Sequence, residues 1–256
     1  MSDVLVLCYH GLSSDWPSSL AVRPRSFEEQ LTLLVERGYR GVTFSQAVLD
    51  APGDKVLAVT FDDGFESVLR EAVPIMRRLG LPGTVFVCTD FVGSKQPMRW
   101  SGIQQWSSGP YSSEVVPMTW DELRSLAASG WEVGSHTRSH ARLPAVGDDE
   151  LDDQLARSRD TLEQQLGEPC LSVAYPYGDY DERVVEAARA AGYRAAATLA
   201  LHRASPLTWP RVGVYDRDDL RRFRLKISRI RRLLGANGVR LRPGGTRRPD
   251  RAPQPS

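Results

Sequence analysis

The sequence has few cysteines and no long apolar segment. Its 256 residues include three cysteines, an odd number without close spacing, which argues against a disulfide framework. No apolar run approaches the roughly 20 residues that a membrane-spanning helix needs. The chain also opens without a basic, apolar leader, so we expect a soluble protein of the reducing cytoplasm. Histidine is scarce as well, with four residues, so the position of each one is informative.

The chain as a whole also lacks a large excess of positive or negative charge, because its formal net charge is +1. Nine basic side chains and one acidic one lie in residues 226–256, which gives this segment +8 and leaves −7 for residues 1–225. An acidic body is not typical of nucleic-acid binding, so we expect no such partner. We predict a catalytic domain over 1–225 and a flexible basic tail over 226–256. Attraction of the tail to an anionic membrane surface or a lipid-linked substrate is the alternative.

Short apolar runs alternate with capped amphipathic stretches along the chain. Helices are predicted from capping boxes at Ser26 and Thr119, from an N-cap at Asp181, and over residues 149–166. Strands are predicted at 4–8, 41–43, 57–60, 84–87, 132–135, 171–174, 195–198 and 211–214. This alternation indicates an α/β fold whose parallel sheet closes, or nearly closes, into a barrel. Chemistry in such folds gathers on loops at the carboxyl ends of the strands.

Two adjacent carboxylates follow one predicted strand. Asp62 and Asp63 come directly after residues 57–60, and Gly64 permits a sharp turn there. Two such carboxylates are costly to bury unless a cation or hydrogen-bond donors lie near. Taken alone, the same residues also fit an Asp-Gly turn with helix-capping acids.

Two of the four histidines follow another predicted strand. His136 and His140 come after residues 132–135, and on a helical turn this spacing would place both imidazoles on one face. A lone pair of this kind also arises by chance. Together with the acidic pair at an equivalent strand end, however, the histidines suggest an open set of two imidazoles and one carboxylate. Such a set suits Zn²⁺ or a neighbouring divalent metal and leaves a position for water.

Two more strand ends carry candidate residues. In residues 174–179, Ala-Tyr-Pro-Tyr-Gly-Asp, the proline and glycine fix a loop in which the Tyr177 N–H could face a developing oxyanion. A plain turn before the next helix explains this loop equally well. His10 follows the strand at 4–8, where a structural histidine bonded to backbone is the alternative.

Three motifs, in this order and spacing, resemble those of the polysaccharide deacetylase family (NodB homology, carbohydrate esterase family 4). They are Thr60-Phe-Asp-Asp-Gly64, Ser135-His-Thr-Arg-Ser-His140 and Tyr175-Pro-Tyr-Gly178. The resemblance covers about residues 4–215. It implies a distorted (β/α) barrel of seven or eight strands and metal-dependent removal of N-acetyl groups from amino sugars.

The resemblance also implies roles for individual residues. Asp62 would be the general base, and the Tyr177 N–H would bind the oxyanion. The metal, Zn²⁺ in the first instance and otherwise Co²⁺, Ni²⁺ or Mn²⁺, would be held by Asp63, His136 and His140.

Two departures from the family pattern affect the site. Ala174 stands where the family has an arginine oriented toward the base, and we predict that Arg211, at the start of the last strand, takes its place. The usual C-terminal Leu-x-His motif is missing, and His202 lies in an expected loop. Leu7-Cys-Tyr-His10 resembles family members in which the final strand comes first. We therefore predict His10, rather than His202, as the general acid.

A long insertion, residues 91–120, lies between a predicted strand and helix. Loops of this length are usually functional or disordered. We predict that Trp100 and Trp106 form a wall of the substrate groove, with Pro176 and Tyr177 as further substrate contacts. Anchoring of the insertion to the barrel by aromatic packing is the alternative.

The sequence therefore predicts a hydrolase that removes N-acetyl groups from an amino sugar in a polysaccharide, a glycolipid or a small glycoconjugate. Deacylation of another amide or of an O-acetyl ester is a second reading. A carbohydrate-binding module that keeps the fold without turnover is a third, which the two departures leave open and the complete Asp/His set disfavours. Cys8, Cys88 and Cys170 are expected to be buried thiols.

Overall fold

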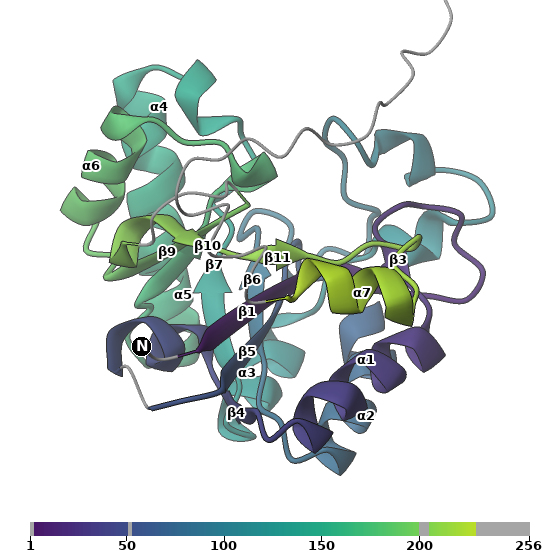
Figure 1. Cartoon of the computed structure of the whole chain (residues 1–256). Coiled ribbons are helices and arrows are strands. Elements are labelled where there is room, and N and C mark those ends of the chain that lie inside the picture. Colours follow the sequence, from purple (N-terminus) through teal and green to yellow (C-terminus); the bar gives the residue numbers. More distant parts are fainter. Residues whose placement is uncertain (1–2, 51–52, 200–204, 229–256) are drawn as a thin grey trace, which may run out of the picture.

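Parallel strands form the centre of the molecule (Figure 1). The computed structural model describes residues 3–50, 53–199 and 205–228, and His202 lies outside them. The strands of the main sheet are β1 (Val4–Tyr9), β4 (Arg40–Val42), β5 (Val56–Phe61), β6 (Thr84–Val87), β7 (Glu132–Ser135), β8 (Ser172–Ala174), β9 (Ala195–Thr198), β10 (Trp209–Pro210) and β11 (Val212–Gly213). They follow the order β10-β9-β8-β7-β6-β5-β1-β11, with β4 also paired to β5.

One residue connects β10 and β11, the two outermost strands of this order. Arg211 separates β10 from β11, and its N–H donates to the Thr198 carbonyl of β9 (2.9 Å). Three residues later, the Val214 N–H donates to the Cys8 carbonyl of β1 (2.8 Å). The chain thus leaves one edge of the sheet and joins the other, and the sheet is a nearly closed barrel, as predicted. The strand predicted at 211–214 is one residue too long at each end, because Arg211 still bonds to β9 and β11 ends at Gly213.

The other predicted strands are confirmed. Those that became β6, β7 and β9 match residue for residue, and the rest differ by one residue at one or both ends. A small separate pair, β2 (Gly11–Leu12) and β3 (Ala21–Val22), follows β1. Because β1 pairs in parallel with both β5 and β11, the first described strand lies beside the last described one.

Helices cover the outside of the barrel. They are α1 (Pro24–Glu36), α2 (Val73–Arg78), α3 (Trp120–Ala128), α4 (Asp148–Asp152), α5 (Ser158–Leu166), α6 (Glu182–Ala190) and α7 (Leu220–Lys226). A π-helical turn, Asp153–Arg157, joins α4 to α5, so the helix predicted at 149–166 is confirmed as one helical run.

Side-chain caps predicted from the sequence account for the starts of two helices. Thr119 and Glu122 form the predicted capping box of α3, and Asp181 accepts the Val184 N–H (2.9 Å) at the start of α6. The capping box predicted at Ser26 is wrong. The helix begins earlier, at Pro24, because proline fixes a helical φ and lacks the N–H that a cap would satisfy.

Strand residues alternate between two apolar clusters. One side of each strand faces the surrounding helices, as Leu57 and Val59 of β5 do, and the other faces the barrel interior, as Val56 and Ala58 do. The interior cluster is built largely from small side chains and two rings, Phe44 and Phe86, which meet edge to face. Continuing the alternation along β5 turns Thr60 and Asp62 inward above this cluster, so a carboxylate enters the mouth of the barrel.

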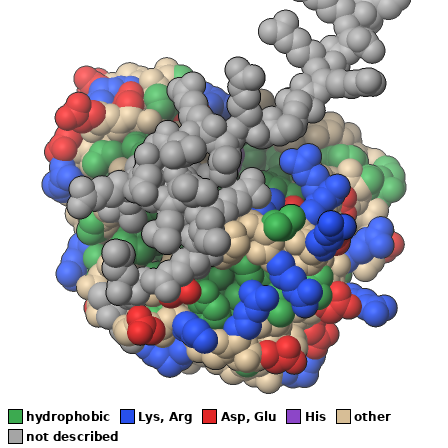
Figure 2. All heavy atoms as spheres, viewed as in Figure 1, with side chains coloured by type: hydrophobic (Ala, Val, Ile, Leu, Met, Phe, Trp, Pro, Cys, Tyr) green, Lys and Arg blue, Asp and Glu red, His purple; other side chains and the backbone are tan. Residues whose placement is uncertain are grey.

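The last described helix is strongly basic. Within α7 lie Arg221, Arg222, Arg224 and Lys226, and Figure 2 shows Lys and Arg side chains gathered where Figure 1 places this helix. Lys226 belongs to the helix and Ile227 is buried, so the packed domain continues to the end of the described residues. Residues 229–256 lie outside them, and the predicted tail stays a prediction. No described helix has the length and apolar character to cross a membrane.

We expect Gly134→Ala in β7 to destabilise the barrel by about 1–3 kcal/mol, because overpacking forces neighbours to shift. An added Cβ would lie 2.6 Å from the Phe86 ring and 2.7 Å from Ser172 Oγ. Urea denaturation measures the change. Gly147→Ala is the control, since its Cβ would meet nothing within 4 Å, and it should cost less than about 1 kcal/mol even though Gly147 is an N-cap. Equal losses for the two variants would contradict the packing argument.

Candidate active site

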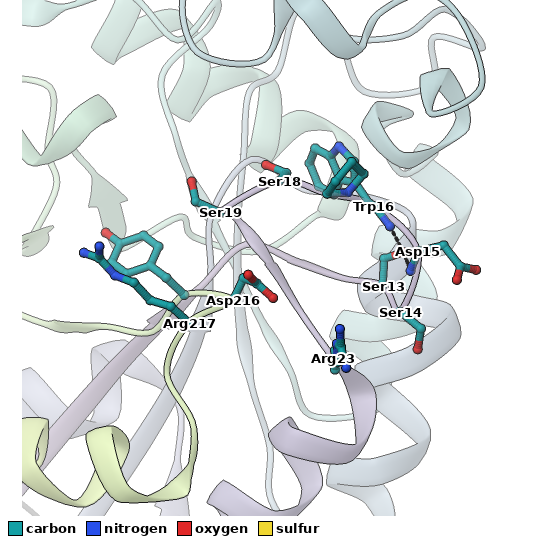
Figure 3. A pocket seen from close by; sticks show the side chains of 11 residues that line it. Ser13, Ser14, Asp15, Trp16, Ser18, Ser19, Arg23, Asp216 and Arg217 are labelled. Atoms are coloured by element: carbon teal, nitrogen blue, oxygen red, sulfur yellow. Dashed lines mark hydrogen bonds between the residues drawn. The ribbon is translucent and has the colours of Figure 1, made fainter. Parts of the chain in front are cut away.

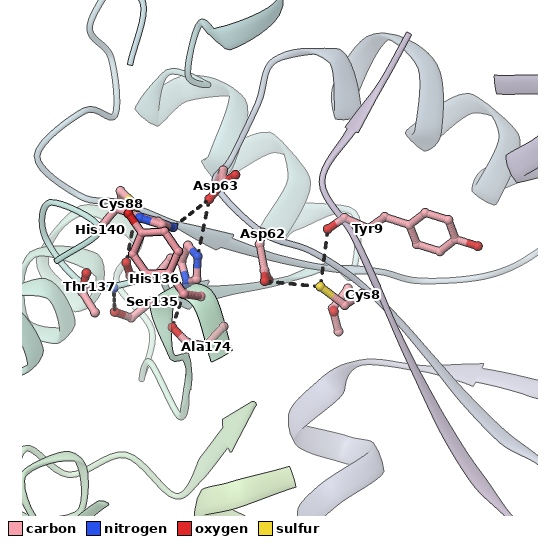
Figure 4. Close-up of polar contacts among 12 residues, drawn as sticks. Cys8, Tyr9, Asp62, Asp63, Cys88, Ser135, His136, Thr137, His140 and Ala174 are labelled. Atoms are coloured by element: carbon pink, nitrogen blue, oxygen red, sulfur yellow. Dashed lines mark hydrogen bonds and ion pairs between the residues drawn. The ribbon is translucent and has the colours of Figure 1, made fainter. Parts of the chain in front are cut away.

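The predicted site residues lie at the carboxyl ends of the strands, and Figure 4 shows Asp62, Asp63, His136 and His140 among them. Asp62 and Asp63 follow β5, and His136 and His140 follow β7. His10 follows β1. Neighbouring parallel strands end at the same edge of the sheet, so residues distant in sequence come together there.

Three ligand atoms converge on one point. Asp63 Oδ1 lies 3.4 Å from His136 Nε2 and 3.4 Å from His140 Nε2. All three side chains are buried, and Asp63 Oδ1 has no hydrogen-bond partner among the described residues. Two donors that each lie about 2.1 Å from a tetrahedral ion are separated by about 3.4 Å. The spacing and the unpartnered oxygen therefore fit a bound metal ion.

The two histidines are oriented differently. His136 Nδ1 lies 2.7 Å from the Ala174 carbonyl, which can only accept, so Nδ1 carries the proton and Nε2 is free to bind a metal. The His140 ring stacks on Trp100 (centroids 4.4 Å apart, 14° between planes) and meets the edge of Tyr177. Burial lowers the pKa of His140 to about 3, so its imidazole is neutral, which is the form that binds metals.

The backbone at the site is unusual. His136 and His140 do not lie on the predicted helical turn, because Thr137 and His140 adopt positive φ angles of 67° and 61°. Both imidazoles nevertheless reach Asp63, which itself has a φ of 73°. Tyr177 is similar, with a φ of 61°. Such conformations cost free energy and cluster at functional sites, where the surrounding structure holds them in place.

Arg211 binds the second carboxylate. Its guanidinium donates from Nη1 to Asp62 Oδ1 (2.6 Å) and from Nη2 to Asp62 Oδ2 (2.7 Å), and it also reaches Thr60 Oγ1 (2.9 Å). Arg211 is only 2% exposed and Asp62 3%. Burial alone would raise the pKa of Asp62, but the charge of Arg211 lowers it below its ordinary value. Arg211 thus binds Asp62, the residue predicted from the sequence as the general base.

His10 lies at the edge of the same site. Its ring stacks on Tyr215 with centroids 6.2 Å apart, and its Nδ1 has no hydrogen-bond partner in the described part of the chain.

A pocket of about 320 Å³ opens above these groups. Its lining includes His10, both aspartates, both histidines and Tyr177, and also Trp100 and Trp106 from the insertion. Pro176 is buried and does not line it. Trp106 also meets Trp16 and Tyr111 edge to face. The insertion therefore contributes to the pocket wall and is anchored by aromatic packing at the same time.

A second pocket, of about 690 Å³, adjoins the first (Figure 3). The two share the wall formed by Pro17, Ser18 and Ser19. The second is lined by the loop between β2 and β3 and by residues 215–217 after β11, which are linked through the Asp216 N–H and the Ser19 carbonyl (3.1 Å). Its lining is mostly hydroxyl and charged groups.

Comparison with known proteins decides the family. The sequence profile of the family described as polysaccharide deacetylase matches residues 50–196, more than half of the chain. The chain belongs to the polysaccharide deacetylase family. This deacetylase match contains Asp62, Asp63, His136, His140 and Tyr177, whereas His10 and Arg211 lie outside it.

Individual relatives agree with the family. YxkH of Bacillus subtilis (strain 168), named as a polysaccharide deacetylase, is 25% identical over 198 residues, which are 75% of this chain and 63% of that protein. The poly-beta-1,6-N-acetyl-D-glucosamine N-deacetylase of Escherichia coli (strain K12) is 27% identical over 143 residues, 49% of this chain and 19% of that enzyme. The chain therefore spans less than two thirds of either relative.

Solved structures share the fold. IcaB from Ammonifex degensii superposes with a TM-score of 0.71 at 25% identity, covering 89% of this chain and 97% of that one. The Streptococcus pyogenes deacetylase PplD, solved with acetate, gives 0.73 at 20% identity, covering 88% and 98%.

Sequence reasoning missed one wall of this deacetylase-family site. The loop after β2 contributes Pro17, Ser18, Ser19 and Leu20 to the pocket. The signal was available, because this serine-rich loop follows closely on the carboxyl end of the first strand. Small hydroxyl side chains carry no recognisable catalytic pattern, so the sequence alone does not identify this wall.

We expect Arg211→Ala to lower the free energy of unfolding by about 3–5 kcal/mol, because it leaves the Asp62 charge buried and unpaired. Arg138→Ala is the matched control. Arg138 pairs with Asp90 and Asp153, but its side chain is 29% exposed, so its loss should cost no more than about 1 kcal/mol. Urea denaturation of both variants measures the difference. Losses of equal size would show that the buried pair contributes no more than a surface one.

Proposed function

We propose that this protein is a metal-dependent hydrolase that removes N-acetyl groups from amino sugars. One observation carries the proposal: an unpartnered Asp63 oxygen and two imidazole nitrogens converge beside a second, arginine-bound aspartate in an open pocket. A binding module would have no need for two buried carboxylates in these two different environments. Membership in the deacetylase family supports the same reaction class.

Asp63, His136 and His140 would hold the metal. Two neutral nitrogens and one carboxylate suit Zn²⁺, with Co²⁺, Ni²⁺ and Mn²⁺ as alternatives. A divalent ion of this kind, when bound, makes water acidic enough to attack near neutral pH and polarises an acyl oxygen.

Asp62 would act as the general base. It lies next to the ligand Asp63 in sequence and lines the same pocket. Arg211 fixes both of its oxygens and keeps it ionised, so it is ready to accept a proton from the water that attacks the acetyl carbon. The resulting oxyanion would receive a hydrogen bond from the Tyr177 N–H, and Pro176 would serve by fixing this loop.

His10 would act as the general acid. It lines the pocket together with Asp62, and it offers an imidazole that can carry a proton to the departing nitrogen. The C–N bond of the amide breaks as the amine takes this proton, and acetate and a free amino sugar are formed.

The pocket supports a saccharide substrate. Trp100, Trp106 and Tyr177 offer aromatic surface for sugar rings, and the Escherichia coli relative is named for a polymer of N-acetylglucosamine. The adjoining second pocket would hold a neighbouring sugar, which favours a polysaccharide over a small glycoconjugate.

Three further expectations complete the proposal. The catalytic domain would include residues 1–225 together with the packed Lys226 and Ile227, with the basic tail beyond them available for contact with an anionic surface. The described cysteines, Cys8, Cys88 and Cys170, are buried free thiols, as predicted, and this supports a reducing compartment such as the cytoplasm.

The central test measures acetate released from N-acetylated amino sugars, with and without a chelator. We expect Asp62→Asn to lower turnover by about 10²–10⁴-fold with metal content retained, because it removes only the base. His136→Ala should lose both metal and activity. Metal analysis of the same samples separates the two cases. An Asp62→Asn variant with most of its activity, or a wild type unaffected by the chelator, would contradict the proposal.

The second pocket is tested by substrate length. Asp216 is exposed there, and we expect Asp216→Ala to raise KM for an N-acetylglucosamine tetramer by about threefold to tenfold, the loss of one hydrogen bond. KM for the monosaccharide should not change. Asp54→Ala, another exposed aspartate remote from both pockets, is the control. A KM change of the same size for both substrates would exclude a separate sugar subsite.

A further inference from the structure

A cysteine thiol lies against the proposed base. Cys8 is near the end of β1 and is completely buried, and its Sγ lies 3.3 Å from Asp62 Oδ2 (Figure 4). The parallel register pairs Cys8 with Thr60 of β5, so neighbouring strands fix this approach. The proposed reaction assigns no task to this thiol.

The thiol is a donor in this contact. Burial raises the pKa of Cys8 well above its ordinary value, and the negative charge of Asp62 raises it further, so the sulfur keeps its proton. Ionised Asp62 can only accept. The Tyr9 carbonyl oxygen is the other acceptor in reach, but it is farther from Sγ (3.8 Å) and uncharged. The contact with Asp62 is therefore an S–H···O hydrogen bond to the carboxylate oxygen, the nearer and stronger acceptor.

The two oxygens of Asp62 are not equivalent. Each carboxylate oxygen has about two lone-pair positions. Oδ2 receives Arg211 Nη2 (2.7 Å) and Cys8 Sγ (3.3 Å), so both positions are used. Within the described chain, Oδ1 receives a single side-chain donor, Arg211 Nη1 (2.6 Å). One lone-pair position on Oδ1 is therefore free to accept a proton.

A second metal site is the competing explanation, because Cys8, His10 and Asp62 offer three ligand atoms within 4.8 Å of one another. The charge of Arg211 argues against it. The guanidinium already occupies both Asp62 oxygens, and a second cation there would face a buried positive charge. Asp63 Oδ1, by contrast, has no such donor.

We propose that Cys8 is a positioning residue. Its S–H···O hydrogen bond fills the second acceptor position of Asp62 Oδ2 and fixes the carboxylate, so that Oδ1 accepts the proton of the attacking water. In the reaction, one O–H bond of the attacking water breaks as the new O–H bond forms on Oδ1, and the thiol proton stays on sulfur. This inference rests on the proposed role of Asp62 as base.

The kinetic test compares Cys8→Ala with Cys170→Ala. Cys170 is a matched control, since it is also buried (3% exposed) and its thiol donates to a backbone oxygen, that of Ser172 (3.6 Å). We expect Cys8→Ala to lower kcat about tenfold, the loss of one hydrogen bond to a charged group, with KM and metal content unchanged. Cys8→Ser restores a donor and should recover most of kcat. Cys170→Ala should leave kcat unchanged.

An infrared measurement tests the contact without turnover. The S–H stretching band removed by Cys8→Ala should lie at lower frequency than the band removed by Cys170→Ala, because a carboxylate is the stronger acceptor. In Asp62→Asn, the Cys8 band should move to higher frequency. The Cys8→Ser variant and the wild-type spectrum serve if Cys8→Ala does not fold.

The outcomes separate the two proposals. Equal kcat values for Cys8→Ala and Cys170→Ala, no recovery with Cys8→Ser, or a Cys8 band that ignores Asp62→Asn would each overturn the role of Cys8. Absence of acetate release by the wild type, or full activity of Asp62→Asn, would overturn the proposed function instead, and the infrared result would still decide whether the thiol holds the carboxylate.

Discussion

The buried ion pair between Arg211 and Asp62 connects the closure of the barrel to its chemistry. Arg211 is the single residue between β10 and β11, where the chain passes from one edge of the sheet to the other. A charged residue at this seam would be costly to bury without a partner. Asp62, directed inward at the end of β5, supplies that partner through two short hydrogen bonds. Closing the barrel and fixing the carboxylate are thus satisfied by the same contact.

This pairing makes two adjacent aspartates chemically different. Asp62 has its oxygens covered by a guanidinium and a thiol, so it is held as an anion that can exchange a proton but has little room for a metal. Asp63 turns the other way, with a positive φ of 73°, and presents an oxygen without a hydrogen-bond partner to two imidazoles. Adjacent residues reach opposite environments because the backbone accepts strain at Asp63.

Periodicity and strand-end reasoning predicted most of this from the sequence. Continuous apolar runs identified the strands, since a barrel strand is buried on both faces, and the rule on strand ends placed Asp62, His136 and His10 at one edge. Capping chemistry worked at Thr119, where no stronger signal competed, and failed at Ser26, where Pro24 set the start of the helix. Positive φ angles at His140 and Tyr177 were not predictable, because non-glycine residues adopt them only under tertiary constraint.

The two departures from the family pattern, at His10 and at Arg211, lie next to paired strands in the structure. His10 and Arg211 come from opposite ends of the sequence, but β1 and β11 are paired, with Leu7 opposite Val212 and Cys8 opposite Gly213. Because β1 lies next to β11, it delivers His10 to the site from the place where the barrel closes. Arg211, next to β11, is then in reach of Asp62, and the Ala174 backbone carbonyl binds His136. A small side chain at Ala174 is therefore compatible with a fixed Asp62 carboxylate, because Arg211, between β10 and β11, supplies the guanidinium.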